Sequence, residues 1–180
     1  MNIFSKKNND WKLRIHVQKG LNLAVADSNG TSDPYAVLLV DGSKKNSTEV
    51  IPKTLNPEWN EHFTIPLSKE KPISFIEIEV WDKDKLTELS FKELLTFKKE
   101  LYQDDFLGKI TLPVGKLFEK INASGEAIEF SSLDNSDVVL PLEKQSEHDN
   151  VQGEIQIKFG LIKGLDNTLS CEQFWNEYIR

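Results

Sequence analysis

The sequence predicts an all-β fold, an antiparallel sandwich of eight short strands. Strand-sized segments with alternating or continuous apolar residues follow one another along most of the chain, and turn signals separate them. Little helix is predicted between most of these segments. Because an α/β fold would show helical periodicity in each connection, the antiparallel sandwich is favoured.

Each strand is predicted from the period of its apolar residues and from the residues that end it. Residues 11–18 alternate apolar and polar side chains, whereas residues 35–40 form a nearly continuous apolar run that stops at the turn signal Asp41-Gly42. A short segment that follows ends at Pro52, which cannot donate to a sheet ladder. The predicted strands are residues 11–18, 35–40, 48–51, 62–67, 73–81, 107–112, 138–142 and 154–161.

Three other segments predict helices. Residues 114–120 predict a short helix between two strands. Residues 86–103 predict a helical insertion, in which Ser90 and Glu93 have the spacing of a capping box. Three apolar residues share one face of this insertion, namely Leu94, Phe97 and Leu101.

The last helix is predicted in the tail, where Ser170 and Gln173 again have capping-box spacing. Its apolar face either packs on the sandwich or docks a partner or a further domain. The residues of that face are Cys171, Phe174, Trp175 and Tyr178. The predicted organisation is an N-terminal extension at residues 1–10, a sandwich domain at residues 11–162 and a C-terminal helix at residues 163–180.

Length and composition limit the class of protein. A chain of 180 residues can form one domain with a full apolar core, and its 38% hydrophobic and 28% charged residues are ordinary for a globular protein. No apolar segment approaches the roughly 18 residues of a membrane-spanning helix, and we expect no signal peptide. Cys171 is the only cysteine, so no internal disulfide can form, which agrees with a reducing, cytoplasmic compartment.

The formal net charge of −7 disfavours nucleic acid as a partner, and five of the negative charges lie where predicted strands begin or end. We expect these five carboxylates to gather at one end of the sandwich and to repel one another. A hard divalent cation with six to eight oxygen ligands relieves that repulsion, and calcium fits best. Two calcium ions would change the formal charge from −7 to −3, so binding would act as an electrostatic switch. The five residues are Asp27, Asp33, Asp82, Asp84 and Asp105.

Six segments occur in order along the chain, namely LRIHVQKGLNL, ADSNGTSDPYAVLLV, KTLNPEWNEHFTIPL, VWDKD, DDFLG and GEIQIKFGLI. Together they resemble a C2 domain, the calcium- and phospholipid-binding module first described in protein kinase C, over about residues 11–162. The resemblance implies a Greek-key sandwich with three loops at one end that hold calcium. The implied ligands are the carboxylates of Asp27, Asp33, Asp82, Asp84 and Asp105 and the backbone carbonyls of Ala26 and Lys83.

Loop 3 departs from the usual C2 pattern, because twenty residues separate Asp84 from Asp105 and include the predicted insertion. Neighbouring Asp104 is an alternative ligand to Asp105. The apolar residues of the insertion either enter a bilayer interface or cap the sandwich edge. The predicted lipid-binding residues are Lys85, Leu86, Leu89 and Phe91 of loop 3 and the basic residues Lys44, Lys45 and Lys53, of which Lys44 and Lys45 alternatively only solvate a strand connection.

The leading function is calcium-dependent targeting to anionic, phosphatidylserine-containing membranes, on a cytosolic face such as that of the Golgi or endosomes. The alternative is calcium-independent interaction with a protein or with a catalytic domain of the same parent chain. Some segments resemble the amino-terminal C2 regions of fungal extramitochondrial phosphatidylserine decarboxylases and of Nedd4-type HECT ubiquitin ligases, which would make the parent an enzyme. No catalysis is expected here, since His16, His62 and His148 lie far apart and none has a motif partner.

Overall fold

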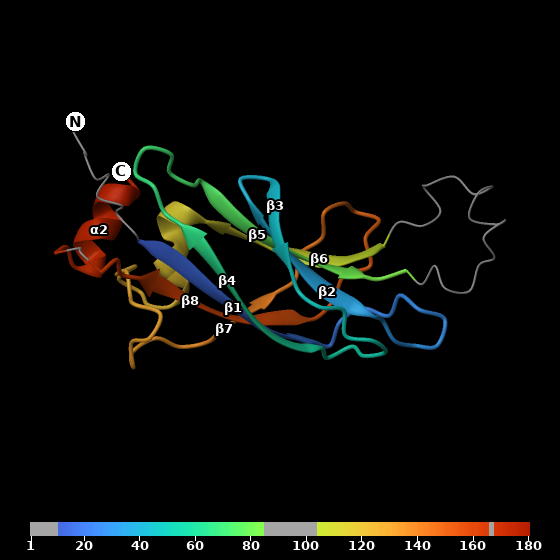
Figure 1. Cartoon of the computed structure of the whole chain (residues 1–180). Coiled ribbons are helices and arrows are strands. Elements are labelled where there is room, and N and C mark those ends of the chain that lie inside the picture. Colours follow the sequence, from blue (N-terminus) through green and yellow to red (C-terminus); the bar gives the residue numbers. More distant parts are fainter. Residues whose placement is uncertain (1–10, 85–103, 166–167) are drawn as a thin grey trace, which may run out of the picture.

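Two four-stranded antiparallel sheets form the molecule, and the computed structural model describes residues 11–84, 104–165 and 168–180 (Figure 1). The first sheet has the order β4-β1-β8-β7, and the second has the order β3-β2-β5-β6. The predicted fold class, an eight-stranded antiparallel sandwich, is therefore confirmed. The strands are β1 (Lys12–Leu21), β2 (Pro34–Val40), β3 (Ser43–Ser47), β4 (Glu58–Pro66), β5 (Phe75–Asp82), β6 (Asp105–Pro113), β7 (Val138–Pro141) and β8 (Glu154–Ile162).

The core lies between the sheets and is built from alternate residues of each strand. In β1 the inward side chains of Leu13, Ile15 and Val17 are buried, while the polar residues between them face outward. Each fully buried aliphatic side chain stabilises the fold by roughly 1.5–3 kcal/mol relative to an exposed one. This period of two is the pattern that identified the strands in the sequence.

The hairpin after β2 differs from the prediction. The third strand is Ser43–Ser47, not residues 48–51. Asp41 and Gly42 both have positive φ, which suits a two-residue hairpin, so pairing resumes at once and Val40 lies opposite Ser43. Because β3 is an edge strand whose five residues are all exposed, it has no apolar signal in the sequence.

Two of the three predicted helices fall among the described residues. Residues Val114–Lys120 form a 3₁₀ helix, η3, and Cys171–Tyr178 form the α-helix α2. A capping box between Ser170 and Gln173 starts α2, as the spacing predicts. The predicted insertion at residues 86–103 and the N-terminal extension at residues 1–10 lie outside the described residues.

Helix α2 packs on the end of the sandwich, which decides between the two interpretations of its apolar face. The ring of Phe174 stacks on Trp11 with centroids 4.3 Å apart, and Trp175 meets Phe118 of η3 edge-on at 5.0 Å. Phe174, Trp175 and Tyr178 are each at most 2% exposed. These side chains therefore belong to the core and do not form a free docking face.

Candidate metal centre

Strand register brings the predicted aspartates to one end of the sandwich, opposite α2 (Figure 1). Asp33 immediately precedes β2, whose first residue, Pro34, pairs with Asp82 at the end of β5. Asp82 in turn pairs with Asp105, the first residue of β6. Three carboxylates from distant parts of the sequence thus lie side by side where neighbouring strands of one sheet begin or end. Asp27 and Asp84 reach the same place from the adjoining loops.

A bulge in β6 sets the position of Asp105. The β5–β6 register shifts between Val80 and Trp81, which leaves one extra residue, Leu107, on β6. The next residue, Gly108, has a φ of 137°, and a Cβ built there would lie 2.7 Å from the Cβ of Leu142. Only glycine fits this position without a shift of its neighbours. The glycine of the DDFLG segment therefore serves the geometry of the site.

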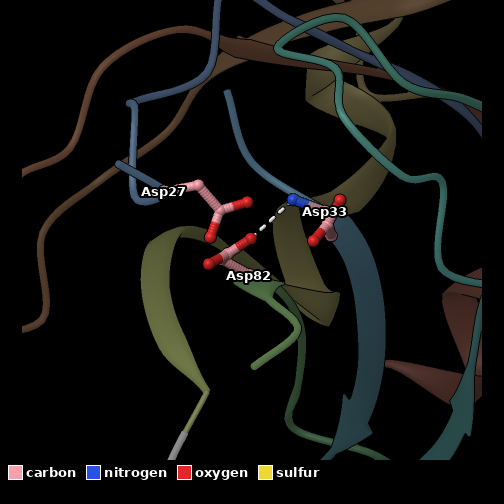
Figure 2. A group of neighbouring side chains, drawn as sticks. All are labelled: Asp27, Asp33 and Asp82. Carbon is pink, nitrogen blue, oxygen red and sulfur yellow. Dashed lines mark hydrogen bonds between the residues drawn. The ribbon is translucent and has the colours of Figure 1, made fainter. Parts of the chain in front are cut away.

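The five carboxylates form two groups that share Asp82. Oxygen atoms of Asp27, Asp33 and Asp82 lie within 4.8 Å of one another, and so do oxygens of Asp82, Asp84 and Asp105. Figure 2 shows the first group, with the carboxylates of Asp27 and Asp82 turned toward each other. Two oxygens that bind the same calcium ion at about 2.4 Å can lie at most about 4.8 Å apart. The spacing within each group therefore suits ligation of a single ion.

Backbone hydrogen bonds hold the two innermost carboxylates. The N–H of Asp33 donates to Oδ1 of Asp82 (Figure 2), and the N–H of Lys53 donates to Oδ1 of Asp33 at 2.7 Å. The N–H of Lys83 donates to the carbonyl of Asp33 at 3.0 Å, which joins the ends of β2 and β5. Each bond fixes one carboxylate oxygen or one backbone segment. The orientation of the group is thus set by the fold.

The KTLNPEWNEHFTIPL segment anchors the loop that carries Asp27 and Asp33. The N–H of Thr54 donates to the carbonyl of Ser32 at 2.8 Å, and the indole N–H of Trp59 donates to the carbonyl of Pro34 at 3.1 Å. The hydroxyl of Ser32 accepts from the N–H of Ala26 and donates to the carbonyl of Ala24. This loop is therefore tied at both ends to buried parts of the sandwich.

The electrostatics of the cluster favour a bound cation. Asp82 is fully buried, and this burial is the main cause that raises its carboxyl pKa to about 6, against the opposing effect of the hydrogen bond from Asp33. Repulsion from neighbouring carboxylates raises the pKa further. Burial, followed by the charges of Asp105 and Asp104, also raises the pKa of Asp84. Within the described part of the chain, Oδ2 of Asp82 meets no hydrogen-bond donor.

Asp104 has a different place from Asp105. Its Oδ2 accepts from the hydroxyl of Tyr35, its Oδ1 accepts from the N–H of Asp84 at 3.0 Å, and Lys83 Nζ lies 3.6 Å away. The carboxylate of Asp105, by contrast, joins the cluster. Asp104 thus braces the loop that carries Asp84. This contact was not predicted, because a hydrogen bond between Tyr35 and Asp104 leaves no mark in either local segment.

The structure separates the three predicted basic residues. Lys44 and Lys45 lie on the exposed edge strand β3, where Lys44 pairs with Leu39, about 20 Å along β2 from Asp33 at 3.3 Å per residue. Lys53 is exposed beside the aspartate cluster, where its N–H contacts Asp33. The structure therefore does not bring Lys53 together with Lys44 and Lys45. The other predicted lipid-binding residues, Lys85, Leu86, Leu89 and Phe91, lie outside the described residues.

The predicted backbone ligands occupy positions beside the carboxylates. Ala26 directly precedes Asp27, and its N–H is held by Ser32 and by the carbonyl of Thr31. Lys83 lies between Asp82 and Asp84, and its N–H is engaged by Asp33. These contacts fix the backbone on the N–H side of each residue. The role of the carbonyls of Ala26 and Lys83 as calcium ligands stays a prediction.

The fold and this loop end define a class of protein, a β-sandwich module with a cluster of carboxylates between its loops. The family model of the C2 domain matches residues 11–130. The chain therefore belongs to the C2 domain family. Within the described residues, no helix is long and apolar enough to cross a membrane.

Curated relatives match parts of this chain. It is 40% identical over 75 residues to the protein unc-13 homolog 4B of Drosophila melanogaster, a match of 41% of this chain and 6% of that protein. It is 34% identical over 116 residues to GTPase activating protein 1 of Oryza sativa subsp. indica, which covers 64% of this chain and 58% of that protein. The chain thus spans less than two thirds of the length of either relative.

Solved structures share the fold. The first C2 domain of plant extended synaptotagmin 1 has a TM-score of 0.60 and 19% identity, with 89% of this chain and all of that domain covered. The calcium-bound pair of C2 domains of extended synaptotagmin 2 has a TM-score of 0.57 and 20% identity, with 86% of this chain and 46% of that chain covered. At this level of identity the likeness concerns the fold alone.

Proposed function

We propose that this C2 domain binds calcium through Asp27, Asp33, Asp82, Asp84 and Asp105 and thereby attaches to anionic, phosphatidylserine-containing membranes. The observation that supports this function is the shared cluster, in which five carboxylates form two groups with oxygens within 4.8 Å. Structural surface turns do not require five carboxylates at such spacing, and the mutual repulsion carries an energetic cost in the absence of a cation.

The residues of the site perform three tasks in this mechanism. Asp82 contributes a carboxylate oxygen to each group, while the N–H of Asp33 holds its Oδ1 in place. Asp27 and Asp33 complete one group from the loop before β2, and Asp84 and Asp105 complete the other from the two ends of the β5–β6 connection. Without a cation, this end of the molecule repels anionic headgroups. Bound calcium would cancel the repulsion and supply coordination positions for phosphate or carboxylate oxygens of the lipid.

Neutral and negatively charged oxygens together are the ligands that calcium prefers over magnesium, which demands tighter octahedral geometry. The predicted carbonyls of Ala26 and Lys83 would add to the set. We propose no catalytic role for these residues. We also propose that this domain recruits its parent protein to the cytosolic face of a membrane. A catalytic domain elsewhere in a longer chain is compatible with this role.

Sedimentation with phosphatidylserine vesicles tests this function. We expect binding in calcium, none in chelator, and none in calcium for the double variant Asp82→Asn with Asp84→Asn, because two shared ligands are lost. Asp134→Asn is the matched control, since Asp134 is an exposed aspartate on another loop, and it should bind like the unaltered chain. Calcium titration by calorimetry should show heat for the control and none for the double variant.

Binding that persists unchanged in chelator would overturn the calcium mechanism and support the alternative, a calcium-independent interaction module. Calcium heat without vesicle binding would retain the metal site and reject the anionic membrane as its target. The two measurements therefore test the metal and the lipid separately.

A further inference from the structure

A row of basic side chains crosses the outer face of the β4-β1-β8-β7 sheet. In the antiparallel register, His16 of β1 lies directly opposite His62 of β4 and opposite Lys158 of β8. Arg14, two residues before His16, points to the same face. Directly opposed residues have Cβ atoms about 4.5–5.5 Å apart, so these four side chains form one compact group. The sequence did not predict it, because His16 and His62 lie far apart along the chain.

The two imidazoles are in contact. Their rings stack with centroids 4.0 Å apart and an interplanar angle of 11°. The guanidinium Nε of Arg14 donates to Nδ1 of His62 at 3.2 Å. An Nδ1 that accepts a hydrogen bond leaves the proton of a neutral imidazole on Nε2. His62 therefore retains one N–H donor for a ligand, and Arg14 retains the donors of its two NH₂ groups.

An aromatic ring holds the two permanent cations. The guanidinium carbon of Arg14 lies 5.1 Å from the centroid of Phe130, and Nζ of Lys158 lies 5.0 Å from it. The edge of His62 meets the same ring at 5.8 Å. The chain can cross the sheet here because position 160 is glycine, where a Cβ would lie 2.4 Å from the backbone of Phe130. Cation–π contacts of this kind restrain flexible side chains.

The local charge is opposite to that of the whole chain, whose formal net charge is −7. Asp137 is a counter-charge that acts on His16, and its two oxygens accept from Gln18 at 2.9 Å and from Gln156 at 3.2 Å. Arg14 and Lys158 thus face outward without a carboxylate at ion-pair distance among the described residues. A dianion complements two fixed positive charges.

We propose that Arg14, His16, His62 and Lys158, ordered around Phe130, form a second binding site, separate from the aspartate cluster, for the dianion of a phosphate monoester. A tetrahedral phosphate offers three oxygens to donors that converge from three neighbouring strands, whereas a carboxylate offers only two. This site does not depend on calcium. The phosphate belongs either to a lipid headgroup or to a soluble ester.

The imidazoles make the site dependent on pH. Burial is the main cause that lowers the pKa of both His16 and His62, and the charges of Arg14 and Lys158 lower that of His16 further. Asp137 and Asn60 act on His16 in the opposite direction. The two rings are therefore neutral at pH 7.5 and gain charge at lower pH, which strengthens the attraction for an anion.

Imidazole resonances of the full chain in chelator, followed by NMR, test the proposal with glycerol 3-phosphate as the probe. We expect saturable shifts of His16 and His62 and none of comparable size for His148, which lies outside the strands of this sheet. Sodium chloride at matched ionic strength should not reproduce them. Sulfate, which keeps two charges between pH 5.5 and 7.5, should bind more tightly at pH 5.5 than at pH 7.5, because the imidazoles gain positive charge as the pH falls.

Variants separate a site from general electrostatics. Arg14→Gln and Lys158→Gln should each weaken the binding of glycerol 3-phosphate about tenfold, as the loss of one charge-assisted hydrogen bond predicts. Lys44→Gln, which removes a cation from the other sheet, should leave it unchanged. Equal weakening by all three variants, or no saturable shift in the unaltered chain, would overturn the proposal. A melting curve confirms that each variant is folded.

Vesicles identify the source of the phosphate. Sedimentation in chelator with phosphatidylinositol 4-phosphate vesicles, lost in Lys158→Gln, would assign the site to a lipid headgroup. Binding of glycerol 3-phosphate without sedimentation would assign it to a soluble ester. Absence of both would reject the site, whatever the outcome of the calcium experiments.

Discussion

Asp82 is fully buried and adjoins other carboxylates, and both conditions disfavour its charged form. Its pKa of about 6, raised first by burial, lies above the ordinary value of 3.8. A carboxyl group whose pKa is raised on folding favours the folded state when protonated. Its contribution to stability is therefore present below about pH 4 and is lost as the pH rises through 6.

Asp82→Asn should consequently stabilise the calcium-free protein at pH 7.5. We expect about 1–3 kcal/mol, of which the upper figure is the equivalent of the rise in pKa from 3.8 to about 6, with a smaller gain at pH 5. The amide keeps an acceptor for the N–H of Asp33. Urea unfolding in chelator measures the difference, with Asp134→Asn as the control. A variant that is less stable at both pH values would contradict the account.

Tyr35 and Asp104 define a second prediction for single residues. Tyr35→Phe removes the hydroxyl that donates to Asp104, which also accepts from the N–H of Asp84. We expect calcium affinity to fall about threefold to tenfold, since a hydrogen bond to a charged group contributes roughly 1.5–3 kcal/mol and the loop is only partly released. Calorimetry measures the affinity in a variant that remains folded.

Tyr178→Phe is the matched control for that experiment. Tyr178 belongs to α2, at the other end of the molecule, and its hydroxyl accepts from the N–H of Ile73 at 2.8 Å. It should lower stability and leave calcium affinity unchanged. Equal effects of both variants on affinity would show that Tyr35 acts through general stability and not through the loop.

At the scale of elements, the bulge of β6 links strand geometry to the site. Gly108→Ala should destabilise the fold by about 2–4 kcal/mol, because φ is positive and the added Cβ meets Leu142 and Val151. It should also weaken calcium binding in the remaining folded fraction, since Asp105 lies three residues away. Gly115→Ala is the control, because its added Cβ would have no atom within 4 Å other than those of its own chain neighbours and helix turn. Similar stability of the two variants would exclude the steric argument.

The elements also show what the sequence could predict. Apolar alternation identified the strands that bury side chains, because burial itself imposes that pattern. The edge strand β3 was placed wrongly, since its residues are all exposed. The five aspartates were expected at one end from their positions beside strands, and the register brings them there. The pairs Tyr35 with Asp104 and His16 with His62 arise from long-range pairing, which no local pattern encodes.

Over the whole molecule, α2 and the aspartate cluster lie at opposite ends (Figure 1). Trp175→Ala should cost about 3–5 kcal/mol, because its ring is 2% exposed and packs on Phe118. Calcium affinity per folded molecule should not change. Asn176→Ala, on the exposed side of the helix, should have little effect on either quantity. Thermal unfolding and calorimetry together would reveal a coupling between the ends, which this packing does not predict.

The sharing of Asp82 between two groups of carboxylates has a consequence for the binding curve. Under the proposed function, two ions that use one common anion cannot bind as independent events, and each alters the affinity of the other by the same factor. Asp82→Asn should therefore abolish both steps of a calcium titration together, whereas Asp27→Asn should affect mainly one. The number of calcium-binding steps lost in each variant would then show which carboxylates each ion uses.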